Sequence, residues 1–357
     1  MGDFYCKKIT VPMAGVPEPP FAFPSEYPKK DDMMYYELGG TYEDGTSVSI
    51  RVYPEIGFKS TDLYYNNTPV EMAGDVWQPH IYHAAPWGSY ISSPTPNRVR
   101  DARFTFRGET VDMRKFGRRR PAHGVAYDTV WNYQEPEITP QGIQFRGYMD
   151  ILPGDENFEA FPYPCRLSAQ YCLRKRELIF TYTVENLGDR AMPFGICKHP
   201  YFTALHPEEL IEIKVEADSV YETTGDLLPT GRLIPVSGEN GTDLNEFRSL
   251  DSLMLDAVYT RLRSQDIYVR YPERGYQMRI RSSGDFQNVV VFTLTAVLKK
   301  WGMLPGKDLP TLFCIENQTC CTDGINMHEK GFAESGLIIL EPGQKHSGSI
   351  SYCFEDI

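Results

Sequence analysis

The sequence lacks the cysteine patterns that mark metal-binding or disulfide-stapled proteins. Its eight cysteines are scattered without a CxxC pair, and Cys320 and Cys321 are adjacent in the chain. Neither zinc-finger spacing nor a secreted disulfide framework fits this distribution. Free buried thiols are the simpler interpretation.

Long apolar runs and basic charge are also missing. No stretch is long and apolar enough to cross a bilayer, and the N-terminus has no unbroken apolar segment of the kind found in secretory signals. The formal net charge of −12 disfavours nucleic acids and anionic membranes as partners, because polyanions are bound by basic surfaces. We therefore expect a cytoplasmic protein that takes a small molecule.

Several sequence motifs of known chemistry are absent as well. We find no HxH, HExxH, GxSxG, P-loop or GxGxxG motif. These absences weaken metallohydrolase, serine hydrolase, kinase and dehydrogenase interpretations. From this evidence we predict neither a cofactor nor a metal site.

Short alternating segments dominate what is present. Apolar and polar residues alternate in 48–53, 178–185, 211–216 and 276–281, and the NVVVFTLT segment at 288–295 is typical of a strand covered on both faces. Turn residues separate these segments, and no long amphipathic helix or βαβ spacing is evident. The pattern predicts an all-β fold, a large antiparallel β-sandwich formed by one domain over residues 35–357.

Prolines are concentrated near the N-terminus, in residues 11–30. Proline disfavours both helices and central strands. We therefore predict that residues 1–34 form a separate, extended N-terminal arm lying on the body of the domain, without a catalytic role.

Five residues stand in sequence contexts that suit proton transfer or sugar binding: Arg98, His123, His199, Asp256 and Glu316. Glu316 follows an apolar stretch, where a partly desolvated carboxylate becomes a better base. Histidine titrates near neutrality and can act as an acid. Each residue also has an ordinary structural explanation, such as a salt bridge, a turn or a solvated edge.

The order of several motifs resembles the aldose 1-epimerase (galactose mutarotase-like) family from about Tyr35 to the C-terminus. The matching elements are Pro94 with Asn97-Arg98, His123-Gly124 followed by Trp131, the HPYF motif at 199–202, Leu255-Asp256, the ENQ motif at 316–318 with Asp323 and Asn326, and the closing LEPG at 340–343. These motifs in the right order are together more specific than any one of them. The resemblance implies a galactose mutarotase-like supersandwich.

The resemblance also implies roles for individual residues. Glu316 would be the general base at the C1 hydroxyl and His199 the general acid at the ring oxygen. The sugar would be bound by Arg98, His123 and Asp256 beside Asn97, with an aromatic platform from Trp131, Tyr201 or Trp87. No cofactor would be needed for α- and β-anomer exchange.

Some positions depart from the family pattern. Lys198 stands where asparagine is common, Thr203 replaces another asparagine, and Tyr127 stands where arginine is common. The basic run Arg114–Arg120 suggests either a solvated loop or a site for a phosphate or carboxylate on the sugar, and we favour the loop. The substrate is therefore expected to be a hexose, either neutral or acidic.

Two other functions remain open at this point. A β-sandwich can serve as a non-catalytic carbohydrate-binding or regulatory module. Asp256 and Glu316 could instead form the carboxylate pair of a glycoside hydrolase, or serve a lyase.

Overall fold

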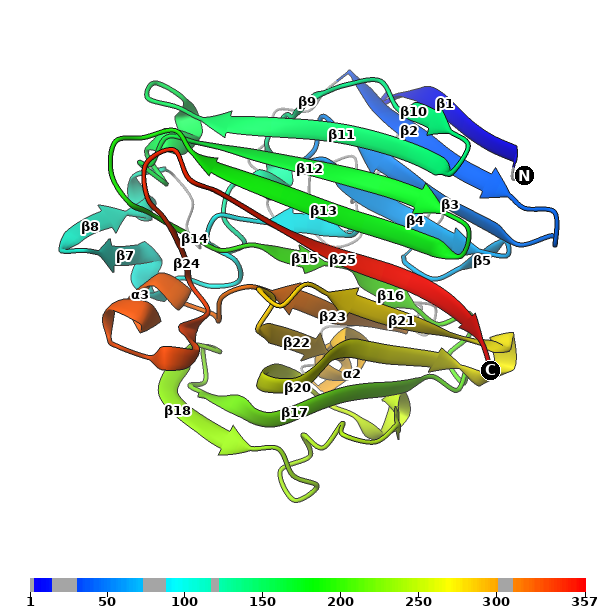
Figure 1. Ribbon diagram of the computed structural model, residues 1–357. Coiled ribbons are helices and arrows are strands. Elements are labelled where there is room, and N and C mark those ends of the chain that lie inside the picture. Colours follow the sequence, from blue (N-terminus) through cyan, green and yellow to red (C-terminus); the bar gives the residue numbers. More distant parts are fainter. Residues whose placement is uncertain (1–2, 15–30, 73–87, 117–121, 301–310) are drawn as a thin grey trace.

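The computed structural model describes residues 3–14, 31–72, 88–116, 122–300 and 311–357. Antiparallel strands dominate these ranges (Figure 1). The alternation in the sequence therefore predicted the fold class correctly.

A five-stranded antiparallel sheet forms one layer, in the order β1-β2-β3-β4-β5. Its strands are β1 (Asp3–Pro12), β2 (Asp32–Thr41), β3 (Ser47–Tyr53), β4 (Lys59–Tyr65) and β5 (Thr68–Pro69).

A 16-stranded sheet forms the rest of the framework, with the main order β10-β11-β12-β13-β25-β21-β20-β22-β23-β15-β6. The C-terminal strand β25, red in Figure 1, joins β13 on one side to β21 on the other. The first half of the sheet has β9 (Asn132–Tyr133), β10 (Glu137–Thr139), β11 (Gly142–Ile151), β12 (Cys165–Arg174), β13 (Glu177–Asn186) and β25 (Lys345–Asp356). The second half has β6 (Tyr90–Ser92), β15 (Cys197–His199), β16 (Tyr201–Thr203), β17 (Glu212–Thr223), β18 (Pro229–Pro235), β19 (Arg248–Ser249), β20 (Asp256–Tyr271), β21 (Tyr276–Ser282), β22 (Asn288–Phe292) and β23 (Leu312–Gln318).

Short elements complete the described part of the chain. Two-stranded ladders pair β7 (Arg103–Phe106) with β8 (Glu109–Asp112) and β14 (Met192–Phe194) with β24 (Ile338–Leu340). Helices α2 (Leu294–Lys300) and α3 (Gly324–Glu329) each cover fewer than ten residues. Single 3-10 turns lie at Arg100–Ala102, Met113–Phe116, Ala126–Asp128, Glu156–Phe158, Leu250–Ser252, Pro272–Arg274 and Ala333–Ser335. None of the helices in the described ranges has the length and apolar character that a membrane crossing requires.

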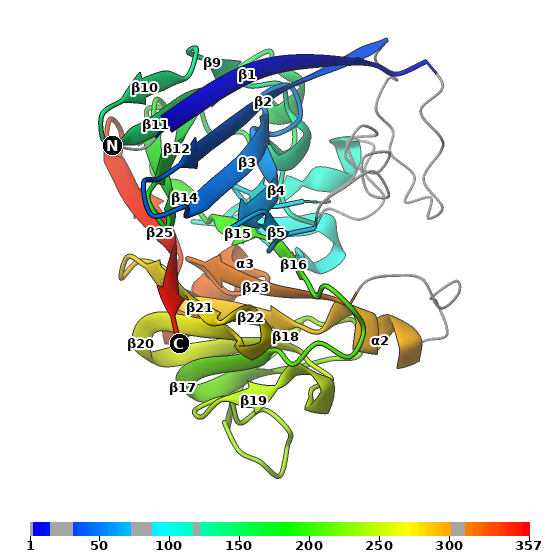
Figure 2. The same cartoon turned by 90° about the vertical axis from the view of Figure 1, so that its right-hand side faces the viewer.

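One part of the core lies between the five-stranded sheet and the β11–β13 part of the large sheet, which face each other in Figure 2, and the same cluster continues through residues of β17 and β20–β23. Tyr36 of β2 packs against Phe145 of β11 at 4.9 Å between ring centroids. Phe58, just before β4, stacks on Trp131 and contacts Tyr171 of β12. Burial of these aromatic rings is a large apolar contribution to stability.

Residues 1–34 were predicted to form a separate extended arm, but the first part of this segment is a strand of the five-stranded sheet. Asp3–Pro12 is strand β1, paired along its whole length with β2, from Asp3 opposite Thr41 to Pro12 opposite Asp32. Pro12 ends this edge strand, a place where proline is tolerated. Residues 15–30 lie outside the described residues, and the single domain over 35–357 stays a prediction.

One predicted strand is shorter than expected. The segment 288–295 forms β22 only as far as Phe292, and α2 begins at Leu294. The Thr293 carbonyl accepts a hydrogen bond from the Val297 amide at 3.0 Å, as the residue before a helix does. The Thr293 hydroxyl oxygen accepts a bond from the Leu255 amide at 2.8 Å, which ties this turn to the start of β20.

Candidate active site

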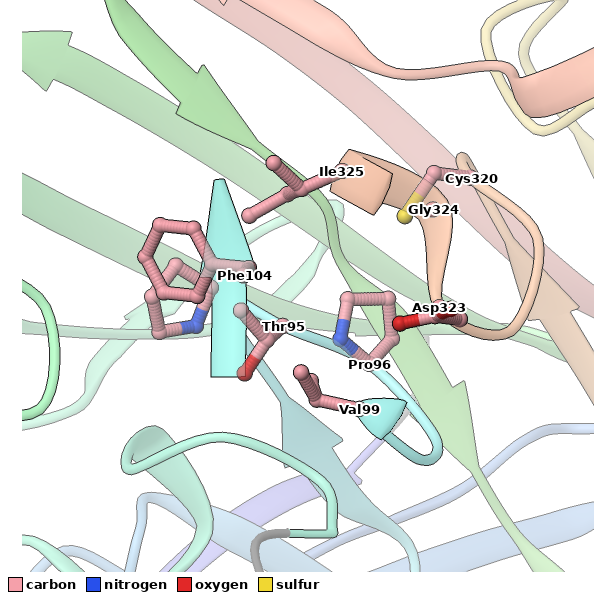
Figure 3. A pocket seen from close by; sticks show the side chains of 9 residues that line it. Thr95, Pro96, Val99, Phe104, Cys320, Asp323, Gly324 and Ile325 are labelled. Atoms are coloured by element: carbon pink, nitrogen blue, oxygen red, sulfur yellow. The ribbon is translucent and has the colours of Figure 1, made fainter. Parts of the chain in front are cut away.

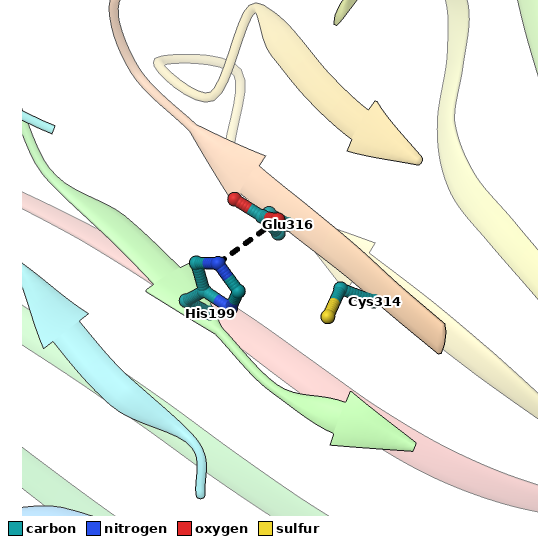
Figure 4. Close-up of side chains that lie close together, drawn as sticks. All are labelled: His199, Cys314 and Glu316. Carbon is teal, nitrogen blue, oxygen red and sulfur yellow. Dashed lines mark ion pairs between the residues drawn. The ribbon is translucent and has the colours of Figure 1, made fainter. Parts of the chain in front are cut away.

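The centre of the site is formed by two neighbouring strands, β15 and β23. Their antiparallel register pairs Cys197 with Gln318 and Lys198 with Asn317, so the next position brings His199 opposite Glu316. His199 Nε2 lies 3.1 Å from Glu316 Oε1, and the side chains point toward each other in Figure 4. Both residues are almost fully buried, with 4% and 3% of their surface exposed. A buried imidazole therefore lies in contact with a buried carboxyl group.

Burial shifts the two groups toward their uncharged forms. Desolvation, reinforced by the Asp256 carboxylate, raises the pKa of Glu316 well above its ordinary value, while the Arg98 cation partly opposes this shift. Desolvation lowers the pKa of His199 well below its ordinary value, and His123 and Arg98 add to the effect. Both shifts favour a neutral imidazole beside a protonated carboxyl group, an arrangement that holds one proton for the pair.

Two tyrosines enclose the His199 ring. Tyr90 of β6 stacks on it with ring centroids 4.5 Å apart and an interplanar angle of 22°. Tyr201 of β16 stacks with centroids 5.0 Å apart and an angle of 27°. Both rings pack against the imidazole, which restricts its rotation.

His123 and the Asn97-Arg98 pair come from loops that contact each other. The His123 amide donates to the Asn97 carbonyl at 2.7 Å, and Arg98 forms a backbone bridge with Ala122. His123 packs edge-on against His199, with centroids 5.3 Å apart, and desolvation together with Arg98 lowers the pKa of His123 to about 3. The neighbouring Gly124 has φ 68°, and a Cβ there would lie 2.2 Å from the Ser93 carbonyl oxygen, so this close approach requires glycine.

Arg98 and Asp256 complete the charged groups around the pair. Arg98 Nη1 donates to Asn97 Oδ1 at 3.1 Å, so Asn97 orients the guanidinium group. Asp256 begins β20, where it pairs with Phe292 of β22, and β22 in turn pairs with β23. The charge of Asp256 acts on Glu316, and that of Arg98 lowers the pKa of Asp256 while desolvation raises it.

The structure thus brings most of the predicted site residues together. The assembled set contains Asn97, Arg98, His123, His199, Tyr201, Asp256 and Glu316. These residues offer a base, an acid, a fixed cation, a second carboxylate and aromatic surface in one place. This combination suits proton exchange at a polyhydroxylated ring.

The prediction that Trp131 forms a sugar-stacking platform requires correction. Its indole is 2% exposed, stacks on Phe58 in the main core and donates from Nε1 to the Ala126 carbonyl at 3.1 Å. Both the ring face and the polar atom are already used by the protein. Tyr201 stacks on His199 instead, and Trp87 lies outside the described residues.

Lys198 points away from the pair because successive side chains of a strand alternate between its faces. Its Nζ donates to Ser60 Oγ at 3.2 Å and to the Tyr171 hydroxyl at 2.9 Å, and it also bonds to the Ser89 carbonyl. Lys198, which stands where asparagine is common in the family, therefore contacts the protein interior behind His199 and not the groups beside Glu316.

The basic run at 114–120 is only partly described. Arg114 forms two hydrogen bonds to Asp112, with Nε at 2.8 Å and Nη2 at 2.7 Å. Residues 117–120, which include three arginines, lie outside the described residues. Asp112 also accepts hydrogen bonds from Arg103, so two guanidinium groups share this one carboxylate.

Three further residues beside His199 or Glu316 were not predicted from the sequence: Tyr90, Cys197 and Cys314. Cys197 Sγ lies 3.9 Å from Glu316 Oε2. Cys314 Sγ lies within 4.8 Å of a His199 ring nitrogen and of a Glu316 carboxylate oxygen. The i, i+2 spacing of Cys314 and Glu316 on a strand was the available signal, because such residues share a face.

A small hollow of the fold lies apart from the histidine–glutamate pair (Figure 3). The residues that line it include Pro96, Phe104, Cys320 and Asp323. None of the predicted catalytic residues lines it.

Comparison with known proteins identifies the family of the chain. Residues 70–353 match the model of the family described as "Aldose 1-epimerase". Galactose mutarotase of Sus scrofa is 22% identical over 295 residues, covering 78% of this chain and 80% of that protein. The match to galactose mutarotase of Mus musculus is 25% identical and spans 45% of this chain and 49% of that protein.

A solved structure extends the likeness to the fold. The crystal structure of galactose 1-epimerase from Lactobacillus acidophilus NCFM superposes with a TM-score of 0.72 at 14% identity, covering 99% of each chain. At this identity the likeness shows the shared fold, which is the one that the motif order implied. Because the family model spans most of the chain, the protein belongs to the aldose 1-epimerase family of mutarotase-type isomerases.

Proposed function

We propose that this isomerase interconverts the α and β anomers of a neutral hexose, with Glu316 as the general base and His199 as the general acid. The observation that carries the proposal is the buried contact of 3.1 Å between His199 Nε2 and Glu316 Oε1. Two groups with these opposing pKa shifts can pass one proton through a bound sugar.

The proposed reaction begins with the proton on His199. The Glu316 carboxylate takes the proton of the C1 hydroxyl, the bond between C1 and the ring oxygen breaks as the C1 carbonyl forms, and His199 protonates the ring oxygen. Rotation at C1 and reversal of these steps close the ring on the other face. The proton is returned to its starting group, so the cycle consumes no cofactor.

The surrounding charges support both protonation states of the pair. Arg98 favours the ionised form of Glu316, whereas desolvation favours the protonated carboxyl group reached after ring opening. Desolvation outweighs the influence of Arg98, so the protonated carboxyl group is the favoured form of Glu316 in the sugar-free site.

The binding roles of the other residues follow from their chemistry. Arg98 would donate to ring hydroxyl oxygens, and Asp256 would accept hydrogen bonds from sugar hydroxyls. His123, with a pKa lowered to about 3, would act as a neutral partner. A neutral hexose is favoured over an acidic sugar because Asp256 and Glu316 already place two carboxyl groups in the site.

A cytoplasmic location, inferred from the sequence, is retained as part of the proposal. The location does not enter the chemistry proposed for the pair.

The test is NMR exchange between the α and β anomers of glucose, galactose and their 6-phosphates, measured for the parent and Glu316→Gln. We expect acceleration with the neutral sugars and a loss of about 10²- to 10⁴-fold in the variant, the range typical of a general acid–base group. The matched control is Glu273→Gln, because Glu273 Oε2 also lies 3.1 Å from a histidine, His206, but at the surface. This control should retain full activity.

Other outcomes would point to other functions. Sugar binding without accelerated exchange would support a carbohydrate-binding module. Release of reducing ends from an oligosaccharide would support a glycoside hydrolase. A clear preference for the 6-phosphates would contradict the choice of a neutral substrate.

A further inference from the structure

Three metal-ligating side chains meet beside the candidate catalytic pair. His199 nitrogen, Cys314 Sγ and a Glu316 carboxylate oxygen all lie within 4.8 Å of one another (Figure 4). Cys314 and Glu316 project from the same strand β23, and His199 projects from the adjacent β15. In the described part of the chain, this cluster joins imidazole, thiol and carboxylate in one buried place.

We propose that His199, Cys314 and Glu316 form a binding site for a thiophilic divalent cation such as Zn²⁺, and that occupancy of this site inhibits sugar turnover. The binding site stands on the geometry alone. Only the inhibition rests on the proposed function, since it requires His199 and Glu316 to be the acid and base.

The donor set matches the chemistry of zinc. Zn²⁺ binds thiolate sulfur at about 2.3 Å and histidine nitrogen or carboxylate oxygen at about 2.0–2.2 Å, usually with four ligands. Three donors held within 4.8 Å of one another surround such an ion after small side-chain movements, and water can supply the fourth ligand. Mixed nitrogen and sulfur ligands select zinc and its analogues over magnesium or calcium.

Charge balance gives a physical reason for the cation to bind. Burial disfavours the charged forms of Cys314 and Glu316, and the charge of Glu316 raises the pKa of Cys314 further. A divalent cation neutralises one thiolate and one carboxylate, so the loaded cluster carries no net charge. The neutral His199 imidazole already has a lone pair available for coordination.

The neighbouring charged groups oppose and support binding. The Asp256 carboxylate acts on both Cys314 and Glu316 and attracts a cation. The positive charge of Arg98, which also acts on Glu316, opposes the binding of a cation. A second thiol, Cys197, contacts the other oxygen of Glu316 at 3.9 Å and serves as a natural comparison.

Inhibition follows from the identity of the ligands. A metal bound to His199 and Glu316 occupies both groups that would exchange protons with the sugar. Metal and sugar then compete for the same atoms, so inhibition by Zn²⁺ should decrease as the sugar concentration rises.

The first test is titration of the full chain with Co²⁺ alone, followed by the near-ultraviolet charge-transfer absorption that cobalt–thiolate bonds produce. We expect this band in the parent and in Cys197→Ser, and its loss in Cys314→Ser. Thermal unfolding checks that each variant is folded, and Cys314→Ala provides a second substitution. Zn²⁺ should also raise the melting temperature of the parent by binding the native state.

The second test measures anomer exchange in the presence of Zn²⁺. The Zn²⁺ concentration for half inhibition should rise more than ~10-fold in Cys314→Ser, since even outer-shell losses have effects of this order. Absence of the cobalt band in the folded parent, or its persistence in Cys314→Ser, would overturn the metal site.

The two hypotheses can fail separately. The cobalt band is measured without sugar, so metal binding by a protein that does not accelerate exchange would overturn the proposed function and support the site. Exchange without any cobalt band would overturn the site and leave the proposed function intact.

Discussion

The orientation of His199 depends on two tyrosine rings at the residue scale. Tyr90 and Tyr201 stack on the imidazole, leaving rotation about its Cβ–Cγ bond little space. Proton transfer requires the donor and acceptor at hydrogen-bond distance, so a ring that turns freely spends less time in the reactive arrangement. Tyr90 is therefore a positioning residue in our proposal.

Replacing Tyr90 tests this role. Tyr90→Leu removes the stacking ring, and we expect kcat for anomer exchange to fall about tenfold, corresponding to about 1.4 kcal/mol, while KM changes less. Tyr90→Phe keeps the ring and should remain close to the parent. Steady-state kinetics separate the two parameters. An equal loss in both variants, or a change confined to KM, would argue for a role of the hydroxyl group in sugar binding instead.

Sequence motifs singled out His199, Glu316 and several of the residues that the structure places around them, but not Tyr90. His199 and Glu316 stand in recognisable contexts, whereas Tyr90 reaches the site only because β6 pairs with β15, as Tyr90 opposite His199 shows. Trp131 follows the His123-Gly124 motif closely in sequence, yet its large apolar ring packs in the core. Strand pairing and core packing depend on residues distant in the sequence, so the spacing of residues within a motif does not predict them.

At the scale of elements, strand β15 separates two environments. His199 faces the candidate site, while Lys198 faces an interior that also holds Lys59 of β4. Desolvation and the Lys198 charge lower the pKa of Lys59 to about 7, and desolvation lowers that of Lys198 to about 7, opposed by Glu71. Two partly neutral lysines behind the site make stability depend on pH.

The direction of this dependence follows from proton binding. Between about pH 7 and 10.5 the unfolded chain keeps Lys59 protonated more than the folded chain does, so the free energy of unfolding rises with pH. The slope from one such group is at most about 1.4 kcal/mol per pH unit. Lys59→Met removes this contribution, so the parent should gain stability relative to the variant from pH 8 to 9.5.

Urea unfolding of both proteins at these two pH values measures the effect. Desolvation raises the pKa of Glu71 to about 7. Because the range from pH 8 to 9.5 lies above this value, Glu71 contributes little to the change of unfolding free energy with pH. A constant difference between parent and variant would show that Lys59 is charged in the folded state throughout.

Element types were largely predictable because residue alternation is a local signal. The alternating segment 178–185 falls within β13, and 276–281 falls within β21. The limits of elements were less predictable, as the 288–295 segment shows. Its last residues are β-branched or apolar and fit a strand, but the Thr293 contacts with Leu255 and Val297 end the strand and begin α2.

For the whole molecule, the site is an assembly of segments that are distant in sequence. Arg98 comes from the loop after β6, whereas Glu316 comes from β23, more than 200 residues later. Asp323 connects these regions: its amide donates to the Arg98 carbonyl at 2.9 Å, and its Oδ1 accepts from the Arg100 amide at 3.0 Å. Asn326 Nδ2 donates to the same Oδ1 at 2.7 Å and holds it in place.

This connection predicts that a residue outside the reacting pair controls sugar binding. Asp323→Ala removes the acceptor for the Arg100 amide and places alanine at φ 59°, so we expect the Arg98 loop to shift and KM for the sugar to rise about tenfold. Asp323→Asn keeps an oxygen acceptor and tolerates this backbone conformation, so its KM should stay near that of the parent. Thermal unfolding of both variants provides the control for stability. If both variants lower the melting temperature while KM is unchanged, Asp323 only stabilises the fold; a rise in KM confined to Asp323→Ala shows that it positions Arg98.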